Sequence, residues 1–325
     1  MLDRLIKYWV AKFTNKLLAS VNLYKLIHEN HETLDAKIHK IHKTLDVKIH
    51  KTQINLDNLQ LRLDNLQLRL DNLPQDILKL YYNQENCNPQ KIELSKEIIR
   101  VFDLYVPVQR DFIRKGDNKD GGYLIVNDLS NSDILFSIGV GDNISFDLGC
   151  ENQVSKIVLV DDSVPDFFAP NDNYSLHKKK LGIIDDSTSI TLDKLLNTYP
   201  SDDYILKIDI EGDEWKILSS LPTKTLSKFR QIIIEFHSIF DLVELGSKQK
   251  TFSQLLATHL PVVAHPNNIG GYQVIGNQLF PNVLETTWLR RNSYEFMKGI
   301  NSRVLDLQKP NDPEKSDIWI SWIYR

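Results

Sequence analysis

The first thirty residues carry apolar side chains at helical spacing. Lysines stand between them, and the apolar set is Leu2, Leu5, Trp9, Phe13 and Leu17. This pattern predicts an amphipathic helix over residues 1–30, which would pack on protein or lie on an anionic membrane surface. Because the lysines leave no uninterrupted apolar run of about 20 residues, we expect neither a membrane-spanning helix nor a signal peptide here.

Residues 31–73 repeat the dipeptide Leu-Asp at intervals of eleven and then seven residues. From Leu56 to Leu73 the leucines recur at alternating steps of three and four residues, which is the seam of a coiled coil. Earlier apolar positions follow an eleven-residue repeat, which unwinds the supercoil locally. Pro74 then ends the helix. The segment therefore predicts a rod of about 60 Å, through which the chain forms a homo-oligomer.

Residues 74–95 have the pattern of a linker, because Asn86, Asn88 and Pro89 interrupt any regular spacing. From residue 96 to 325, helical stretches such as ITLDKLLNTY and DEWKILSSL alternate with short apolar runs rich in β-branched residues. These runs are LFSIGV, KIVLVDD, YILKIDI, QIIIEFH and PVVAH. Buried strands that alternate with helices predict one α/β domain, a doubly wound parallel sheet with helices on both faces.

Composition removes some classes of function. The 325-residue chain has a net charge of −4 and no basic block with interleaved aromatic residues, so we expect no nucleic-acid partner. The two cysteines, Cys87 and Cys150, match no metal-binding spacing and suit a reducing compartment. We therefore expect a cytoplasmic protein, with any membrane association made through residues 1–30.

Candidate chemistry lies where the predicted strands end, because doubly wound sheets bind ligands beyond the carboxyl ends of their strands. The first strand ends in GVGDN at 139–143, and its two glycines allow a tight turn close to a ligand. The second strand delivers Asp161 and Asp162, where a carboxylate can bind the hydroxyls of a ribose. Ile144 replaces the third glycine of the dinucleotide fingerprint, which favours S-adenosylmethionine over the pyrophosphate of NAD. The predicted cofactor residues are Gly139, Gly141, Asp142, Asn143, Asp161 and Asp162.

The strand YILKIDI carries charges at alternate positions and runs into EGDEW. In a strand, Lys207, Asp209 and Glu211 would share one face. Because burying unpaired charges costs several kcal/mol, we expect Lys207 to pair with an acid, and the other two to face a ligand at the open end. Asp213 and Glu214 fall in the first turn of the next helix, where acids interact favourably with the helix dipole and need no further role.

The next strand, QIIIEFH, places Glu235 and His237 two residues apart on one face. If the two strands are neighbours, their ends gather Asp209, Glu211, Glu235 and His237. Such a cluster suits general-base catalysis on a hydroxyl, or a divalent metal held by oxygen and imidazole ligands. A structural network of paired charges is the alternative.

A polar run, HPNN, follows the last apolar run at residues 265–268. Its histidine and asparagines would bind a sugar or another polyol, or form a turn. The candidate substrate-binding residues are Glu235, His265, Asn267 and Asn268.

The segment LKIDIEGDEWKIL, residues 206–218, resembles the signature of FkbM-type S-adenosylmethionine-dependent methyltransferases. Other segments agree in order: DGGYLIV (120–126), SIGVGDNISFD (137–147), VDDS (160–163), ITLDKLL (190–196), IIEFH (233–237), HPNN (265–268) and PNVLETTWLRR (281–291). The resemblance covers about residues 100–295. It implies a class I, Rossmann-like methyltransferase fold, S-adenosylmethionine as cofactor, and transfer mainly to hydroxyl oxygens.

The resemblance also implies roles for individual residues. It places Gly139, Gly141 and Asp142 on the methionine side of the cofactor and Asp161 at its ribose. Asp209 and Glu211 would lie beside the sulfonium and the acceptor. The loop reads SIGVGD where many relatives have a form closer to DxGAxxG. Ser137 therefore replaces the usual first acid, and Asp142 or Asp209 would contact the cofactor amine instead.

The main hypothesis from the sequence is an O-methyltransferase that acts on a sugar or glycan hydroxyl. Asp209, Glu211 and His237 are the candidate catalytic residues, with His237 or Asp209 as the base. The alternatives are a non-catalytic coiled-coil scaffold whose α/β domain binds a ligand, and an NAD-dependent oxidoreductase, which Ile144 disfavours. Whether a divalent metal takes part stays open at this stage.

Overall fold

The computed structural model describes residues 88–130, 133–164, 171–276, 278–318 and 320–323. The predicted helix over 1–30, the predicted coiled coil over 31–73 and residues 74–87 of the predicted linker lie outside the described residues. The chain divides into two compact units, Met1–Leu80 and Tyr81–Arg325, and every described residue belongs to the second.

The first described element is helix α4, Pro89–Val101, which includes the last part of the predicted linker. The Asn88 side chain caps it by accepting two backbone N–H groups, and Pro89 occupies its first turn. We had interpreted both residues as breakers, but Asn at the N-cap and Pro in the first turn are preferred at a helix start. The apolar face of α4, including Leu94 and Ile98, is part of the main hydrophobic core. The boundary predicted at residue 96 therefore falls inside a helix of the α/β unit.

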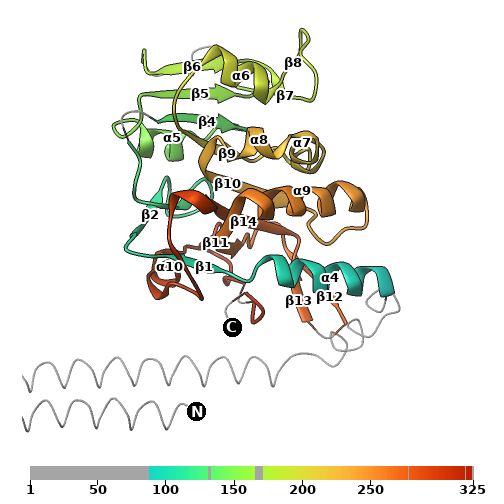
Figure 1. Ribbon diagram of the computed structural model, residues 1–325. Coiled ribbons are helices and arrows are strands. Elements are labelled where there is room, and N and C mark those ends of the chain that lie inside the picture. The colour runs from blue at the N-terminus through green and yellow to red at the C-terminus, as the bar shows by residue number, and fades with distance from the viewer. Residues whose placement is uncertain (1–87, 131–132, 165–170, 277, 319, 324–325) are drawn as a thin grey trace, which may run out of the picture. The chain divides into compact units, whose positions relative to one another are not determined.

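A seven-stranded sheet forms the centre of the described unit (Figure 1). In spatial order its strands are β6 (Tyr174–His177), β5 (Lys156–Val160), β4 (Ile134–Ile138), β9 (Tyr204–Ile208), β10 (Phe229–His237), β14 (Val283–Arg290) and β11 (His259–Pro266). Numbered along the chain, this order is 3-2-1-4-5-7-6. It is the doubly wound order with one additional strand inserted before the last.

The inserted strand β14 runs antiparallel to both of its neighbours, β10 and β11. The pairings among β10, β9, β4, β5 and β6 are all parallel, as predicted from their apolar runs. We did not predict β14 as a strand, because Glu285, Thr286 and Thr287 interrupt its apolar pattern. These side chains are nonetheless buried and hydrogen-bonded. The predicted parallel sheet is therefore a mixed sheet.

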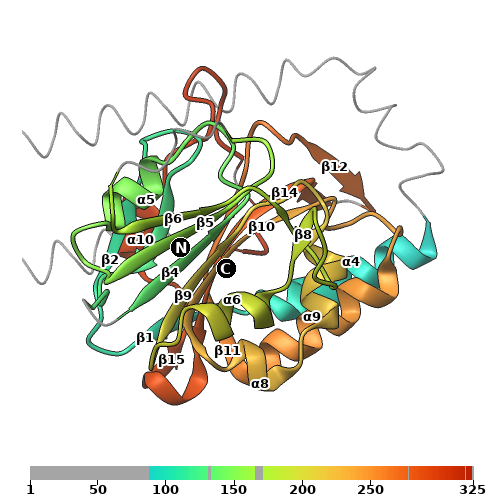
Figure 2. The ribbon, with the colours of Figure 1, turned by 90° about the horizontal axis from the view of Figure 1, so that it is seen from above.

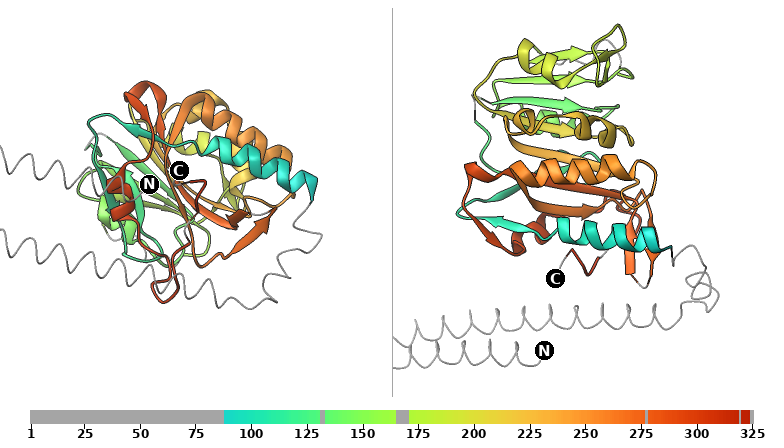
Figure 3. Two further views of the ribbon diagram at one scale, coloured as in Figure 1. Left: turned by 90° about the horizontal axis from the view of Figure 1, so that it is seen from below. Right: turned by 45° about the vertical axis from the view of Figure 1, so that its right-hand side comes forward.

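Helices cover both faces of the sheet (Figure 2). One face packs against α4, α6 (Leu192–Thr198), α7 (Glu214–Ser220), α8 (Thr223–Leu226) and α9 (Leu245–Thr258). The other packs against α5 (Ser145–Cys150), the hairpin of β2 (Phe112–Lys115) and β3 (Tyr123–Val126), and α10 (Ser302–Leu307). Figure 3 shows α4 beside α9, where Phe102 and Phe252 meet edge to face at 5.9 Å.

Short strand pairs complete the described unit. They are β1 (Tyr105–Pro107) with β15 (Phe296–Lys298), β7 (Lys180–Leu181) with β8 (Ser189–Ile190), and β12 (Tyr272–Ile275) with β13 (Gln278–Pro281). A 3-10 turn, η3, spans Arg291–Ser293. Among the described residues, no helix combines the length and the hydropathy that a membrane span requires.

The strand order reverses between β4 and β9, the position where doubly wound sheets bind ligands. The ends of these two strands touch closely, because the backbone N–H of Asp209 donates to the carbonyl of Ile138 at 3.0 Å. Gly139 follows Ile138 with φ of +72°. A Cβ at that position would lie 1.5 Å from the carbonyl oxygen of Asp209. The site thus begins at a contact that only glycine permits.

Candidate active site

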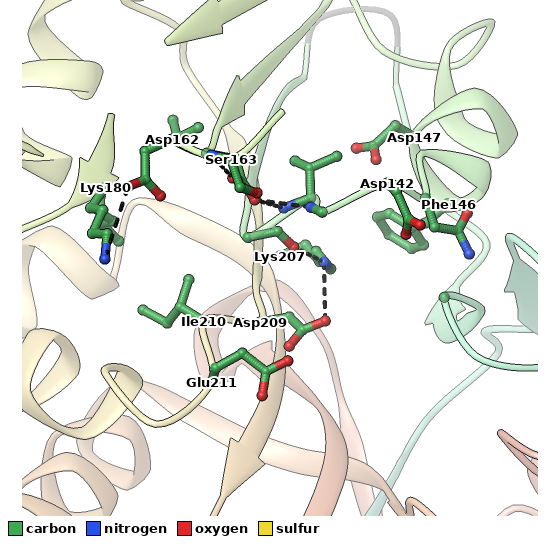
Figure 4. Close-up of a pocket in the computed structure, with 18 of the residues that line it drawn as sticks. Asp142, Phe146, Asp147, Asp162, Ser163, Lys180, Lys207, Asp209, Ile210 and Glu211 are labelled. Atoms are coloured by element: carbon green, nitrogen blue, oxygen red, sulfur yellow. Dashed lines mark hydrogen bonds and ion pairs between the residues drawn. The ribbon is translucent and has the colours of Figure 1, made fainter. Parts of the chain in front are cut away.

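A pocket of about 460 Å³ opens beyond the carboxyl ends of β4, β5 and β9 (Figure 4). All of the residues that we predicted to bind the cofactor line it: Gly139, Gly141, Asp142, Asn143, Asp161 and Asp162. Asp209 and Glu211 also line it. The remaining predicted residues, Glu235, His237, His265, Asn267 and Asn268, lie behind or outside this lining.

Asp161 holds the glycine loop in place. One carboxylate oxygen accepts the backbone N–H groups of Val140 and Gly141 at 2.8 and 2.9 Å. The other accepts the backbone N–H and the hydroxyl of Ser163 at 2.7 and 2.6 Å. Burial alone would raise the pKa of Asp161, but these hydrogen bonds outweigh it and lower the pKa. Because both oxygens already accept two bonds, a ribose contact at Asp161 would have to displace one of them, such as the bond from the Ser163 hydroxyl.

Asp162 is the adjacent acid and is exposed at the pocket wall, 3.9 Å from the ammonium of Lys180. We therefore expect the two acids to respond differently to substitution. Asp161→Asn should lower the free energy of unfolding by about 2 kcal/mol, since its amide nitrogen cannot accept the loop N–H groups. Asp162→Asn should leave stability unchanged and weaken nucleoside binding about tenfold.

Urea unfolding and calorimetric titration of both variants separate these effects. The expectation would be wrong if Asp162→Asn bound the nucleoside like the wild type while Asp161→Asn lost binding without a loss of stability. Asp161 would then be the residue that contacts the ribose.

The chain leaves the strand sooner than predicted after β9. The strand ends at Ile208, and Glu211 and Gly212 turn with φ of +57° and +111°. Glu211 therefore does not continue the face that carries Lys207 and Asp209, and its side chain is 87% exposed. Its carboxylate still reaches within 3.4 Å of His237 Nε2.

Lys207 pairs with an acid, as predicted. Its ammonium donates to the carbonyl of Gly139 at 2.7 Å and lies 3.5 Å from Asp209 Oδ2. The ammonium also lies 5.4 Å from the centre of the Tyr123 ring. These contacts explain how a cation is tolerated in a strand buried on both faces.

Tyr123 connects Asp209 to Glu235. Its hydroxyl lies 3.0 Å from a carboxylate oxygen of each. Burial, followed by the charges of Asp209 and Glu285, raises the pKa of Glu235 to about 8. A protonated Glu235 donates to Tyr123, which donates to Asp209, so each hydrogen bond has one proton. Asn267 donates to the second oxygen of Glu235 at 2.8 Å. Glu235 therefore contacts Asp209 through Tyr123, and Asn267 contacts Glu235, so neither residue lines the pocket. Tyr123 was not among the residues predicted from the sequence.

His237 is held by Glu214, a fully buried acid. One oxygen of Glu214 accepts the backbone N–H of His237 at 2.6 Å and lies 3.2 Å from Nδ1, and the other accepts the N–H of Gly212 at 2.8 Å. Burial would lower the pKa of His237, but the hydrogen bond and charge of Glu214, with the charge of Asp209, outweigh burial and raise the pKa to about 9. A raised pKa favours the protonated form of His237 at neutral pH, so Asp209 is the better proton acceptor of the two candidate bases. We expected Glu214 only to interact with the helix dipole, but it also fixes the backbone and ring of His237.

Two groups of described side chains could hold a metal ion by geometry, since their ligand atoms lie within 4.8 Å of one another. The first consists of Asp209, Glu211 and His237, and the second of Asp120, Glu235 and Glu285. In the first group, Nε2 of His237 lies 4.0 Å from Asp209 Oδ1. Oxygen and imidazole ligands suit a divalent ion, but a protonated His237 balances the same carboxylates by itself.

His265 and Asn268 contact the C-terminal segment and do not line the pocket. His265 lies between Glu285 and Asp317, at 3.2 and 3.4 Å. Burial would lower the pKa of His265, but these two acids raise it to about 9. The Asn268 side chain exchanges hydrogen bonds with the backbone of Asp312 at 2.9 and 2.7 Å. Of the two predicted uses of the HPNN run, these contacts favour the structural one.

The strand order, the glycine loop at the point where that order reverses, and the acid that follows the second strand are consistent with an α/β methyltransferase fold. Residues 107–274 match the family model of the methyltransferase FkbM domain. The chain therefore belongs to the FkbM methyltransferase family, as the sequence motifs predicted, and methyltransferase activity is what this membership supports.

The solved structures that the chain resembles are distant. An rRNA methylase from Streptococcus thermophilus has 10% identity and a TM-score of 0.31, with 50% of this chain and 89% of that chain covered. A putative hemolysin from the same organism has 12% identity and a TM-score of 0.31, with coverage of 67% and 86%. Precorrin-6y C5,15-methyltransferase from Geobacter metallireducens GS-15 has 13% identity and a TM-score of 0.26, with coverage of 50% and 82%. These scores are too low to support an inference. No curated protein matches the chain significantly.

Proposed function

We propose that the chain is an S-adenosylmethionine-dependent O-methyltransferase that acts on a hydroxyl of a sugar or glycan. The observation that carries the proposal is the position of Asp209, a hydrogen-bonded acceptor that faces an acid-lined pocket at the reversal of strand order.

The pocket suits a cationic nucleoside better than a dinucleotide. Its volume of about 460 Å³ lies in the range of small-ligand sites. Its charged lining consists of Asp120, Asp142, Asp147, Asp161, Asp162, Asp209, Glu211, Asp213, Lys180 and Lys207. The excess of carboxylates favours a positive ligand and opposes a pyrophosphate, which argues against the NAD-dependent alternative. Bound S-adenosylmethionine would supply an electrophilic methyl group carried on a positive sulfonium.

The residues of the chain position the acceptor and take up its proton. Oδ2 of Asp209 is engaged by Tyr123 and Lys207, so its orientation is fixed. Oδ1 remains 4.0 Å from His237 Nε2 and is open to accept the proton of an acceptor hydroxyl. Asp120, Asp209 and Asp213 line the pocket, and their carboxylates offer only acceptors, which favours a ligand with several hydroxyl donors.

Calorimetric titration of the full chain with S-adenosylmethionine tests the cofactor, and we expect binding in the micromolar range. Parallel titrations in EDTA, with added Mg²⁺ and with added Mn²⁺ test whether a metal takes part. The same affinity in all three titrations would indicate that His237, and no metal ion, balances the charges of Asp209 and Glu211. Absence of any adenosine-ligand binding would contradict the proposal and favour a non-catalytic scaffold.

A further inference from the structure

Two buried polar atoms beside the glycine loop make no hydrogen bond of normal geometry with any described residue, although the two groups lie near each other. They are Oγ of Ser137 on β4 and Oδ1 of Asp147 on α5. Ser137 is 0% and Asp147 2% exposed. A buried polar group without a partner is destabilising, and the exceptions in folded proteins call for an explanation such as a missing ligand.

The Asp147 carboxylate is hidden from bulk solvent but borders the pocket. Figure 4 shows it on the same side of the pocket as Asp142, opposite Asp162 and Lys180. It lies in the first turn of α5 but makes no cap, since no side chain caps this helix. A ligand in the pocket can therefore reach a carboxylate that water reaches poorly.

Lys207 is the cation that acts on Asp147, and it also pairs with another acid. Ser137 is the register partner of Lys207 on the neighbouring strand, so both side chains point toward α5. Lys207 acts on Asp147 by charge, but its close contacts are the Gly139 carbonyl and Asp209. One ammonium thus serves two carboxylates. Burial, opposed by Lys207 and the Ser137 hydroxyl, raises the pKa of Asp147 to about 6.

We propose that Asp147 and Ser137 bind the α-amino group of the methionine part of the cofactor. The inference rests on the proposed function, because it takes S-adenosylmethionine as the ligand. An ammonium carries three N–H donors, which can satisfy Asp147 Oδ1 and Ser137 Oγ together and add a positive charge beside the buried carboxylate.

The arrangement accounts for the serine at the end of β4. Ser137 on β4 has a small side chain without a charge, and Asp147 on α5 supplies the buried carboxylate of this pair. Our earlier candidates for the amine fit less well. Asp142 is exposed, and Asp209 has one oxygen engaged by Tyr123 and Lys207 while the other is assigned to the acceptor hydroxyl.

Calorimetry on the full chain with three ligands tests the inference. S-adenosylmethionine and S-adenosylhomocysteine carry the ammonium, whereas 5′-methylthioadenosine lacks it. Asp147→Asn keeps the shape but removes the charge, so we expect it to weaken the first two ligands about 10- to 100-fold. Binding of 5′-methylthioadenosine should change by less than about twofold. Asp172→Asn removes an exposed charge outside the pocket lining and controls for net charge.

The outcomes separate the inference from the proposed function. Wild-type binding of all three ligands by Asp147→Asn, or an equal loss of all three, overturns the inference while the cofactor assignment stands. A selective loss of the two amine ligands in Asp142→Asn instead of Asp147→Asn also overturns it. Failure of the unmodified chain to bind any of the three ligands overturns both. If Asp147→Asn does not fold, Ser137→Ala decides, since it should weaken only the two amine ligands, by severalfold.

Discussion

Gly139→Ala is expected to destroy the pocket. The new Cβ would lie 1.5 Å from the carbonyl oxygen of Asp209 and 2.9 Å from Cγ2 of Ile210. The first atom belongs to the backbone and cannot swing away, so β4 and β9 would have to separate at their ends. A left-handed φ of +72° adds strain for any residue with a Cβ. Together these effects should lower the free energy of unfolding by more than about 3 kcal/mol and abolish cofactor binding.

Gly141→Ala is the matched control. Gly141 has a similar φ of +57°, but no atom lies within 4 Å of the Cβ that would be added. Only the left-handed conformation is penalised, which should cost about 1 kcal/mol. Urea unfolding of both variants measures the difference, and equal stabilities would show that the contact between the two strand ends does not constrain the loop.

Asp209→Asn should nearly abolish methyl transfer while it leaves the cofactor bound. An amide in this position still meets Tyr123 and Lys207, but it cannot accept a proton from the acceptor. Removal of a general base typically costs 10²- to 10⁴-fold in turnover, and we expect a loss in this range. The dissociation constant of S-adenosylmethionine should change by less than about fivefold.

Single-turnover transfer and calorimetric binding on the same preparation separate these two effects. Asp172→Asn, on an exposed loop outside the pocket lining, serves as a control for charge. Turnover at the wild-type level in Asp209→Asn would remove Asp209 as the base. The protonated His237 would not take its place without a further change, because a group with a pKa of about 9 is not a proton acceptor at neutral pH.

The sequence predicted the centre of the fold and the residues that line the pocket beyond β4 and β5. Buried parallel strands are continuous apolar runs, and the glycine loop and the acid at residue 161 follow two of them at diagnostic positions. Strand β14 escaped prediction because its central polar residues are buried and paired, which apolar periodicity cannot show. Helix α4 escaped because its capping residues also occur in loops.

The acceptor side was harder to predict because its roles depend on partners distant in sequence. Glu214 was assigned to a helix dipole, yet it holds the backbone and ring of His237 across 23 positions. Tyr123 lies 86 positions from Asp209 and 112 from Glu235. The left-handed turn at Glu211 did have a local signal in the sequence, namely the glycine that follows it. From that signal the end of the strand could have been predicted earlier in the chain.

Transfer of a labelled methyl group is the measurement that tests the central claim most directly. The full chain would be incubated with S-adenosylmethionine labelled in its methyl group and a panel of sugars and glycans, and the products examined by mass spectrometry. The account predicts one added methyl on an oxygen, formed by the wild-type protein and nearly absent with Asp209→Asn. A labelled methyl on nitrogen or carbon, or no transfer to any hydroxyl despite tight cofactor binding, would contradict it.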